Sequence, residues 1–532
     1  MVPVVPVRRR PRPGASRRPL GPLLLVALVA LAACTGGRSD GPGKTGGSGG
    51  GGVAAGRSGG TLAIALLDPG PLDPALAQGL EDEVVLGNLF DGLTSIDPSG
   101  AVRPGVAASW SSDPGLRRWE FRLRPDARWS DGASVRSADF SFAWHRLASP
   151  RTTPRPSARA LLAGVRGYRS FATGRARSIS GLSTPDPATL VVQLDHPFAD
   201  LPALVAALPL SPLPSEAVTA DPAAYLTQPV GNGPFRLATP ARPGRSLTLT
   251  RNPAYPGTLA LLEKVSVHLV PDEQTAWLEL QNGRVSFAPV PPDQLPAART
   301  VYGPGLLQGP TLTTWQLTFN LRSKMSRNPS WRQAISLAVD RDQLAASLAG
   351  TPATTLVPAA TPDGDGGGAP PSCPACAHSP AKARTLLTKA KAPATPVTLA
   401  IPQGAEASAL AALLVEDLAA VGVELQVAPS PSGETPLTLV RGVAPYPRPD
   451  PFLTRPAATS PPAKRLLDQA RATSDTPARA SLYDQAEAQA LTDLTATPLV
   501  TEHHAAVLTP GPQGFNLTPW NTVDLAAISL PA

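Results

Sequence analysis

The sequence predicts an α/β protein with two or three lobes. Two observations support this fold class. About 470 residues follow residue 60, which is beyond the size at which a single hydrophobic core keeps growing. In the second half of the chain, stretches with helical periodicity alternate with short apolar runs typical of strands. This alternation, with short loops between, is the pattern of α/β lobes.

Residues 1–33 have the pattern of a bacterial lipoprotein signal. Six arginines and no acidic residue lie between Arg8 and Arg18, and the stretch from Leu20 to Ala33 is apolar apart from Gly21 and Pro22. That stretch is too short to cross a bilayer but has the length of a signal-peptide core. Its end, Leu31-Ala32-Ala33-Cys34, resembles the lipobox. We therefore expect export, removal of residues 1–33, and lipid on Cys34 that anchors the protein to the outer face of the cell membrane.

The arginines of the signal also resemble a twin-arginine motif at Ser16-Arg17-Arg18-Pro19-Leu20, so the export route stays open between the general and the twin-arginine pathways. Residues 34–59 are mostly Gly and Ser with a few charges. This composition buries too little apolar surface to offset the cost of ordering the chain. We expect a flexible tether there.

The formal charge of +7 would suit a nucleic-acid partner or an anionic membrane, but most of it belongs to the signal. Removing the six arginines of residues 1–33 lowers the charge of the mature chain to +1. We therefore expect no nucleic-acid partner.

In the first half of the chain, strand patterns are separated by a helix and by a long segment rich in Pro, Arg and Ala. A helix is expected around Val84–Leu89, closed by Asp91-Gly92, and the long segment falls in residues 101–228. Strands are expected at Thr61–Leu66, Trp119–Leu123, Leu190–Leu194 and Leu247–Thr250.

The second half has clear helix starts. Asn328-Pro329, Ser379-Pro380 and Thr476-Pro477 each precede an apolar stripe at helical spacing. Another stripe, Leu410, Leu413, Leu414 and Leu418, ends at Gly422 and precedes the strand pattern Val423–Val427. These stripes are expected to be core.

Short motifs follow one another in a fixed order from residue 59 to about residue 530. Those in the first half include Gly60-Thr61-Leu62, Pro71-Leu72-Asp73-Pro74, Leu89-Phe90-Asp91-Gly92-Leu93, Pro104-Gly105-Val106-Ala107-Ala108-Ser109-Trp110, Trp129-Ser130-Asp131-Gly132 and Val230-Gly231-Asn232-Gly233-Pro234-Phe235. Those further on include Arg251-Asn252-Pro253-Ala254-Tyr255, Leu280-Gln281-Asn282-Gly283, Arg332-Gln333-Ala334-Ile335, Val339-Asp340-Arg341 and Ala381-Lys382-Ala383-Arg384. Together they resemble family 5 extracellular solute-binding proteins, which include the oligopeptide- and dipeptide-binding components of ABC importers.

The resemblance implies a large two-lobed fold of the periplasmic-binding-protein type (type II), with an extra subdomain inserted in the first lobe. It implies a monomeric binding protein, not an enzyme, without cofactor or metal, whose partners are a peptide or peptide-like solute, the ABC permease and ATPase subunits, and the membrane through its lipid. The implied boundaries are 60–100, 229–313 and 501–532 for lobe I, 101–228 for the inserted subdomain, and 314–500 for lobe II.

Other functions stay open. The same fold could bind a metal chelate or an oligosaccharide, or act as a ligand receptor in signalling. A secreted hydrolase is a further alternative, but the sequence has no Gly-x-Ser-x-Gly elbow, no His-Glu-x-x-His pair and no Gly-rich phosphate loop after a strand.

One candidate ligand contact comes from a motif of peptide-binding members, Gly-Trp-x-Ala-Asp-Tyr, whose aspartate pairs with the α-amino group of the peptide. The matching positions here carry valine and proline in place of tryptophan and aspartate. Either a nearby aspartate takes over, or the ligand has no free amino end; a turn-capping role for that aspartate is the alternative. The candidate residues are Gly442, Val443, Ala444, Pro445, Tyr446 and Asp450.

Three further groups are candidates, each with a structural alternative. Phe90 and Asp91 could face the ligand or end a helix. Trp315, Phe319 and Asn320 fall at the expected crossing into lobe II and could contact a peptide-like ligand or pack at the hinge. His503 and His504 lie on opposite faces of a predicted strand, so one of them could face the cleft. His503 is the candidate, and the alternative is a surface or interlobe histidine.

Cys373 and Cys376 are the two cysteines beyond the lipid site. A Cys-x-x-Cys pair can be redox-active, bind zinc or begin a haem site. His378 lies one residue too far for the haem motif, and no second such pair exists for zinc. We expect a structural disulfide, since exported proteins fold in an oxidising compartment.

Overall fold

The computed structural model describes residues 58–242, 244–362, 371–391, 395–429, 431 and 435–531. The signal, Cys34 and most of the predicted tether lie outside the described residues. Residues 54–532 form one compact unit. Within the described residues, no helix combines the length and the apolar character needed to cross a bilayer.

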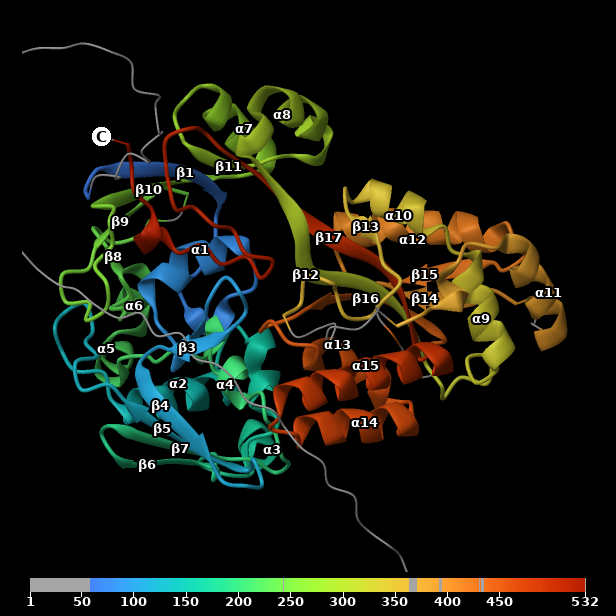
Figure 1. The fold of residues 1–532 in the computed structure, drawn as a ribbon, viewed down its shortest axis with the longest axis horizontal. Helices are drawn as coiled ribbons and strands as arrows, with labels where there is room; N and C mark the ends of the chain where they lie inside the picture. Colours follow the sequence, from blue (N-terminus) through green and yellow to red (C-terminus); the bar gives the residue numbers. More distant parts are fainter. Residues whose placement is uncertain are drawn as a thin grey trace, which may run out of the picture. The chain divides into compact units, whose positions relative to one another are not determined.

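The largest sheet in the described residues runs in the order β15-β14-β16-β12-β17-β11-β1-β10-β9-β8, with β13 paired to β17. Its strands come from both halves of the chain (Figure 1). Their bounds are β1 Thr61–Leu67, β8 Phe235–Leu237, β9 Leu247–Arg251, β10 Lys264–Val270, β11 Phe287–Pro289, β12 Leu306–Phe319, β13 Thr351–Pro352, β14 Val397–Ala400, β15 Leu425–Ala428, β16 Leu437–Val443 and β17 Ala496–Leu508.

Two long antiparallel strands, β12 and β17, connect the two parts of this sheet (Figure 1). The beginning of β12 pairs with the end of β17, where β17 also pairs with β11, and the end of β12 pairs with β16. The pairing shifts register between Pro310 and Thr314, because β12 has more residues there than its partner. Such a bulge bends and twists a strand pair, so the sheet changes direction at this point.

Strand β1 separates two hydrophobic cores. Leu62, Ile64 and Leu66 belong to one core, whereas Ala65 belongs to another. The division follows from the alternation of side chains along a strand. Three helices lie beside this part of the sheet: α1 (Leu80–Leu89), α7 (Glu273–Gln281) and α8 (Leu295–Tyr302).

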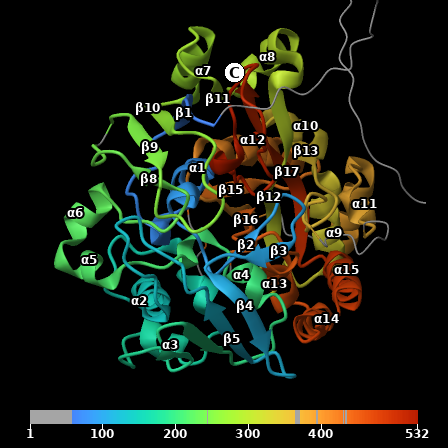
Figure 2. The ribbon, with the colours of Figure 1, turned by 60° about the vertical axis from the view of Figure 1, so that its left-hand side comes forward.

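Residues 94–227 form a second group of strands and short helices, which both views place apart from β1 (Figures 1 and 2). A four-stranded sheet has the order β4-β5-β7-β6, and β2 pairs with β3. Many apolar side chains of this group share the core of Leu62 and Ile64. The bounds are β2 Thr94–Ile96, β3 Val102–Pro104, β4 Ala107–Ser112, β5 Arg118–Leu123, β6 Leu182–Asp186, β7 Thr189–Gln193, α2 Ser137–Ala148, α3 Tyr168–Ala172, α4 Leu201–Leu204, α5 Ser215–Ala220 and α6 Pro222–Thr227.

The helices of the second half belong to two further cores. In one core, the apolar side chains of α9 and α12 pack with those of β14 and β16. In the other, the apolar side chains of α14 and α15 pack around Leu312 and Leu356. The bounds are α9 Pro329–Ala338, α10 Arg341–Ser347, α11 Pro380–Ala390, α12 Ala405–Ala419, α13 Asp450–Ala458, α14 Pro461–Arg471 and α15 Thr476–Asp493.

The helix starts predicted from the sequence are confirmed. The Asn328 side chain accepts a hydrogen bond from the N–H of Ser330 at 3.0 Å, and Pro329 opens α9. This cap satisfies a donor that has no partner within the helix. Helix α15 begins at Thr476 as predicted, but the capping side chain is that of Asp475, one residue earlier.

Candidate ligand pocket

The described residues enclose a pocket with a volume of about 1640 Å³. Its walls come from segments far apart in the sequence, drawn from residues 77–98, 157–165, 194–211, 441–455 and 516–527. Ligand sites for drug-sized molecules are typically about 300–1,000 Å³. This pocket therefore has room for a ligand larger than a single amino acid or sugar.

Asp91 lies on the pocket wall in the loop after α1, and its position is fixed by two partners. Its backbone N–H donates to Asn232 Oδ1 at 3.1 Å, and Asn232 Nδ2 donates to its carbonyl at 3.0 Å. Its carboxylate accepts a hydrogen bond from the Tyr255 hydroxyl at 2.9 Å. Burial raises the pKa of Asp91 to about 6, although the Tyr255 hydrogen bond and the charge of Arg124 oppose the rise.

A second carboxylate on this wall is that of Glu83, in the first turn of α1. Burial raises its pKa to about 8, and the charge of Asp82 adds to the rise. Among the described residues neither Asp91 nor Glu83 forms an ion pair. This side of the pocket therefore favours a positively charged or hydrogen-bond-donating group, because such a group would relieve the cost of burying a carboxylate.

The predicted site at residues 442–450 reaches the pocket in part. Val443, Ala444, Pro445, Tyr446 and Asp450 line it, whereas Gly442 does not. Val443 is 49% exposed at the end of β16, so it presents an apolar side chain where the family motif has tryptophan. Pro445 supplies no carboxylate.

Asp450 is engaged with its own neighbours. Its Oδ1 accepts from Arg471 Nε at 2.6 Å, and its Oδ2 accepts from Arg471 Nη2 at 3.2 Å and from the Thr454 hydroxyl at 3.3 Å. The residue is 6% exposed at the start of α13. A carboxylate held in this way by a guanidinium gains little from a second cation.

The candidates at the crossing into the second half lie away from the pocket. Trp315 and Phe319 are 1% and 3% exposed within a hydrophobic core, and neither lines the pocket. The Trp315 indole donates to Glu502 Oε1 at 2.7 Å, and Arg441 donates to both oxygens of Glu502. The Asn320 backbone N–H donates to the Pro436 carbonyl, and this residue is also absent from the pocket wall. Trp315 and Phe319 therefore pack in a core, as in the alternative interpretation of these residues, and do not face the pocket.

His503 also lies outside the pocket. It is part of β17, and its Nε2 lies 3.3 Å from the Thr351 hydroxyl. Burial lowers the pKa of His503, and burial with the neighbouring imidazole lowers that of His504 to about 4. Among the described residues, no three His, Cys, Asp or Glu side chains gather in a way that could hold a metal ion.

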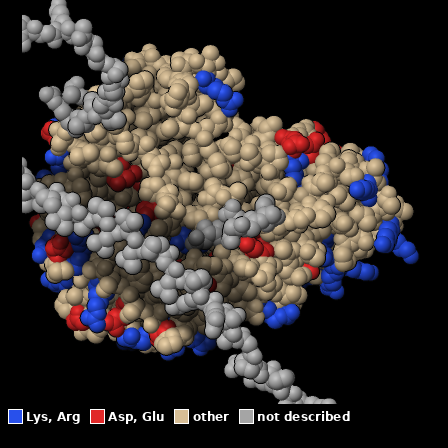
Figure 3. Space-filling model, viewed as in Figure 1, with Lys and Arg blue, Asp and Glu red and all other residues tan. Residues whose placement is uncertain are grey.

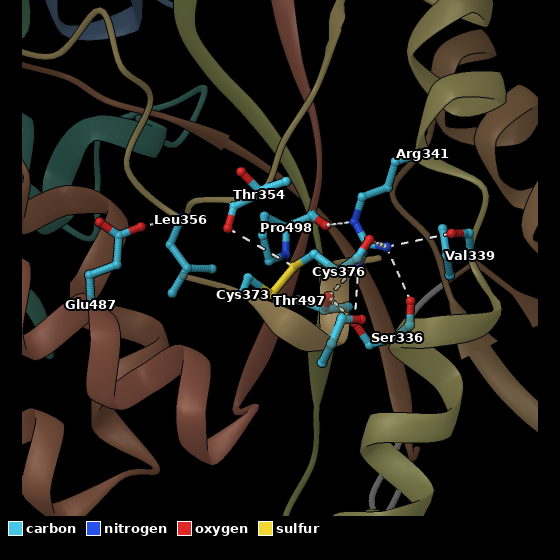
Figure 4. The surroundings of a disulfide bond; sticks show 11 residues. Ser336, Val339, Arg341, Thr354, Leu356, Cys373, Cys376, Glu487, Thr497 and Pro498 are labelled. Atoms are coloured by element: carbon cyan, nitrogen blue, oxygen red, sulfur yellow. Dashed lines mark hydrogen bonds between the residues drawn. A yellow bond between two sulfur atoms is a disulfide. The ribbon is translucent and has the colours of Figure 1, made fainter. Parts of the chain in front are cut away.

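Cys373 and Cys376 form a disulfide with an S–S distance of 1.98 Å (Figure 4). The short loop that it closes is held by buried polar groups. The Arg341 guanidinium donates to the Cys376 carbonyl at 2.8 Å, and the Ser336 hydroxyl donates to the Ala375 carbonyl at 2.7 Å. The disulfide closes a loop in the second half of the chain, and neither cysteine lines the pocket.

Sequence reasoning missed the two residues that position Asp91. Both Asn232 and Tyr255 stand in motifs that carried the family resemblance, but no role was predicted for either residue. A signal was present in the glycines beside Asn232: a Cβ on Gly231 would lie 2.0 Å from the Leu89 carbonyl oxygen, and one on Gly233 would lie 2.7 Å from that of Asn88. Glycine is required where two backbone segments approach so closely.

A large pocket with walls from both halves of an α/β chain, and with partly buried carboxylates, is the architecture of a solute-binding protein. The chain belongs to family 5 of the bacterial extracellular solute-binding proteins, whose middle region matches residues 101–464.

Three comparisons illustrate the family. The periplasmic murein peptide-binding protein MppA of Escherichia coli strain K12 is 27% identical over 497 residues, which cover 86% of this chain and 90% of MppA. The probable deoxycholate-binding periplasmic protein YgiS of the same strain is 29% identical over 297 residues, 55% of each chain. The structure of Haemophilus influenzae OppA in complex with the peptide RPPGFSPFR has a TM-score of 0.71 and 20% identity, covering 90% of this chain and 100% of that chain.

The solved structures share the fold of this chain, so the predicted two-lobed α/β fold of the periplasmic-binding-protein type is confirmed. The inserted subdomain and the residue boundaries of the lobes stay predictions.

Proposed function

We propose that this protein is the exported, membrane-tethered substrate-binding component of an ABC importer, and that its pocket captures peptides or peptide-like solutes. The observation that carries the proposal is the 1640 Å³ pocket, which exceeds the space needed for a small solute. The name of MppA and the peptide bound to OppA support a peptide ligand. The protein acts by binding and delivery, without catalysis.

The location follows from the N-terminal sequence. In the proposal, Cys34 carries the lipid, and residues 34–59 are the tether between lipid and folded body. The tether keeps a monomeric binding protein close to its permease, which raises its effective concentration there. The proposed lobes are residues 60–100, 229–313 and 501–532, with 101–228 inserted, and residues 314–500; closure around ligand favours the state that the permease recognises.

Thermal unfolding with and without ligand tests the peptide assignment. A ligand at 100 times its dissociation constant adds about 2.7 kcal/mol to the free energy of unfolding. A mixture of peptides should therefore raise the thermal midpoint by a few degrees in a saturable way. If peptides leave the midpoint unchanged while oligosaccharides, metal chelates or a bile acid raise it, the peptide assignment fails.

Within the pocket, we propose that Asp91 holds the positively charged group of the ligand. Asp450 is already paired with Arg471, and Pro445 has no charge to offer. Asp91 has a fixed position and forms no ion pair with a described residue. An ammonium group beside it would make a charge-assisted hydrogen bond in a partly desolvated site.

Replacing the proposed anchor, Asp91→Asn, is expected to weaken binding of a peptide with a free amino end by about tenfold, because one charge-assisted hydrogen bond becomes a neutral one. Binding of the N-acetylated peptide should change by less than about threefold. Affinity of the unmodified protein for the free peptide should also fall below pH 6, where the carboxyl takes up a proton. Calorimetric titration measures all three effects; equal losses for both peptides would contradict the role of Asp91.

Trp315→Phe is expected to lower stability while leaving ligand affinity nearly unchanged. The substitution removes the indole donor to Glu502, so we expect the free energy of unfolding to fall by about 1–3 kcal/mol. Ligand affinity should stay within about threefold, because Trp315 does not line the pocket. Urea denaturation and calorimetric titration of one preparation separate the two quantities. A loss of affinity larger than the loss of stability would place Trp315 in the site.

A further inference from the structure

The net charge of about +1 for residues 34–532 conceals a strong local excess. No aspartate or glutamate occurs from residue 140 to residue 185, whereas this segment contains eight arginines. Arg146 is ion-paired with Asp73 at 2.5 Å. The other seven form what we call the arginine surface: Arg151, Arg155, Arg159, Arg166, Arg169, Arg175 and Arg177.

The arginine surface differs in its ion pairing from most arginines of residues 103–124. Arg103, Arg118, Arg122 and Arg124 each have a carboxylate partner within 3.2 Å. Among the described residues, no arginine of the arginine surface has one. Two of them make only neutral hydrogen bonds, Arg166 to Gln193 and Arg175 to Thr173.

The side chains of the arginine surface point to solvent. All are exposed except Arg159, which is partly exposed. Figure 3 shows Lys and Arg side chains gathered along the lower edge of the view, where Figure 1 places α3 and β6, with Asp and Glu side chains between some of them. One nearby carboxylate is that of Asp195, whose backbone N–H donates to the Gly164 carbonyl. Asp186 at the end of β6 is another, but neither carboxylate forms an ion pair with the seven arginines.

The same segment also contributes to the wall of the ligand pocket. Ser157, Ala158, Ala160, Leu161 and Ala163 contribute to the pocket wall, whereas none of the seven arginines does. The arginines therefore do not serve the ligand in the pocket. Any partner that they bind would come from outside the pocket and would be anionic.

The chemistry of the surface favours a phosphate-rich partner. Guanidinium groups bind phosphate oxygens through two parallel hydrogen bonds and lose less hydration than ammonium groups. Among the described residues, the large apolar side chains that are exposed all lie outside residues 140–185: Leu259, Leu261, Leu278, Val301, Val427 and Val443. A specific protein interface needs buried apolar anchors at its centre, whereas a fluid anionic bilayer needs none.

We propose that the arginine surface docks the protein on the anionic phospholipid headgroups of the membrane to which it is tethered. The inference rests on the proposed lipid anchoring for its location, since a tethered body meets the membrane at high effective concentration. Each basic residue near an anionic bilayer strengthens binding by about 1 kcal/mol, or roughly fivefold. Because the same segment also contributes to the pocket wall, docking would bring that part of the wall near the membrane.

Vesicle binding by a chain without lipid tests the surface separately from the anchor. The protein is residues 34–532 with Cys34→Ser, which keeps every described helix and strand. It is mixed at 0.1 M salt with vesicles of phosphatidylcholine alone or with phosphatidylglycerol added. We expect binding only to the phosphatidylglycerol vesicles, and its loss at 1 M salt, where charges are screened within about 3 Å.

Two matched sets of four substitutions locate the contact. The first, Arg151→Gln, Arg155→Gln, Arg169→Gln and Arg177→Gln, should weaken vesicle binding by about 600-fold, since each residue contributes roughly fivefold. The control set, Arg322→Gln, Lys324→Gln, Lys382→Gln and Lys389→Gln, removes the same charge from exposed cations that form no ion pair with a described residue, and should change binding by less than about threefold. Unchanged thermal midpoints show that both proteins fold.

Three results would overturn the proposal: equal losses in the two sets, no binding to phosphatidylglycerol vesicles, or tighter binding to a short DNA duplex than to the vesicles. None of them bears on ligand capture, which the peptide titrations measure. Conversely, if Cys34 carries no lipid in cells while the vesicles still bind, the proposed tethering fails and the surface stands.

Discussion

Asp200→Ala is expected to lower the free energy of unfolding by about 3–5 kcal/mol, because it breaks the ion pair of a buried carboxylate with Arg479 and its hydrogen bond from Tyr483. Asp200 is 3% exposed and precedes α4, next to pocket residues 196–198. Its carboxylate accepts from the Tyr483 hydroxyl at 2.7 Å and lies 3.2 Å from Arg479 Nε and 3.9 Å from Arg448 Nε. Arg448 also donates to the Gly100 carbonyl.

This cluster joins segments that are far apart in the chain and that surround the pocket. Removing Asp200 should therefore also weaken ligand binding, since the walls lose a contact that fixes their spacing. Urea denaturation measures the stability, and Asp195→Ala is the matched control: Asp195 is exposed and only five residues away, so its loss should cost less than about 0.5 kcal/mol. Similar stabilities for the two variants would show that the buried cluster contributes nothing.

Glu487→Gln is expected to stabilise the protein at pH 8 by roughly 2–3 kcal/mol. Glu487 is 2% exposed in α15, and its Oε1 accepts from the backbone N–H groups of Leu356 and Val357. It has no counter-ion among the described residues. Burial raises its pKa from 4.5 to about 7, although the two backbone hydrogen bonds oppose the rise. The amide oxygen of glutamine can accept both hydrogen bonds without carrying a charge.

The sign of the pH effect follows from proton binding. Between pH 4.5 and about 7 the native protein binds more protons at Glu487 than the unfolded chain does, so the free energy of unfolding falls as pH rises through this window. At about 1.4 kcal/mol per pKa unit, the total is roughly 3 kcal/mol. The stabilisation by Glu487→Gln should therefore be small at pH 4.5 and full at pH 8.

The exposed residue Glu424 provides the control for this pH dependence. Urea denaturation of Glu424→Gln should follow the unmodified protein at every pH. If Glu487→Gln has the same effect at pH 4.5 and pH 8, the buried carboxylate does not titrate in this range, and the argument from its burial is wrong.

Local signals in the sequence predicted the helices of the second half because their ends are determined by neighbouring residues. A capping side chain and a proline at the first turn act within three residues, as at Asn328 and Pro329. The order of the large sheet could not be predicted in the same way. Trp315 pairs with Val500, and such a pairing over a long stretch of chain depends on the packing of everything between.

The candidate pocket residues show the same limit. Trp315 was a reasonable candidate by position, but the register shift between Pro310 and Thr314 determines which side chains of β12 face the pocket. There β12 advances four residues, from Pro310 to Thr314, while β17 advances two, from His503 to Thr501. Leu312 and Thr313 lie within this irregular stretch and line the pocket, whereas Trp315 lies after it and packs into the core. No local pattern in the sequence records a bulge of this kind.

The loop residues were easier to place. Val443 to Tyr446 and Phe90-Asp91 stand in motifs of the family, and the structure puts both groups on the pocket wall. Whether each aspartate can bind a ligand depends on partners that no motif reveals. Arg471 forms an ion pair with Asp450, whereas Tyr255 and Asn232 hold Asp91 in position. Only the structure therefore shows which carboxylate of the pocket is paired with a cation and which is not.

The central claim is that the pocket captures a peptide or a peptide-like solute. Native mass spectrometry of the protein, purified from its own cells without denaturation, tests it most directly, since a ligand enclosed by two lobes can survive purification. We expect a bound mass that fragments into amino-acid residues and that decreases in Asp91→Asn. A bound mass without amino-acid residues, such as a steroid acid or an oligosaccharide, would contradict the claim.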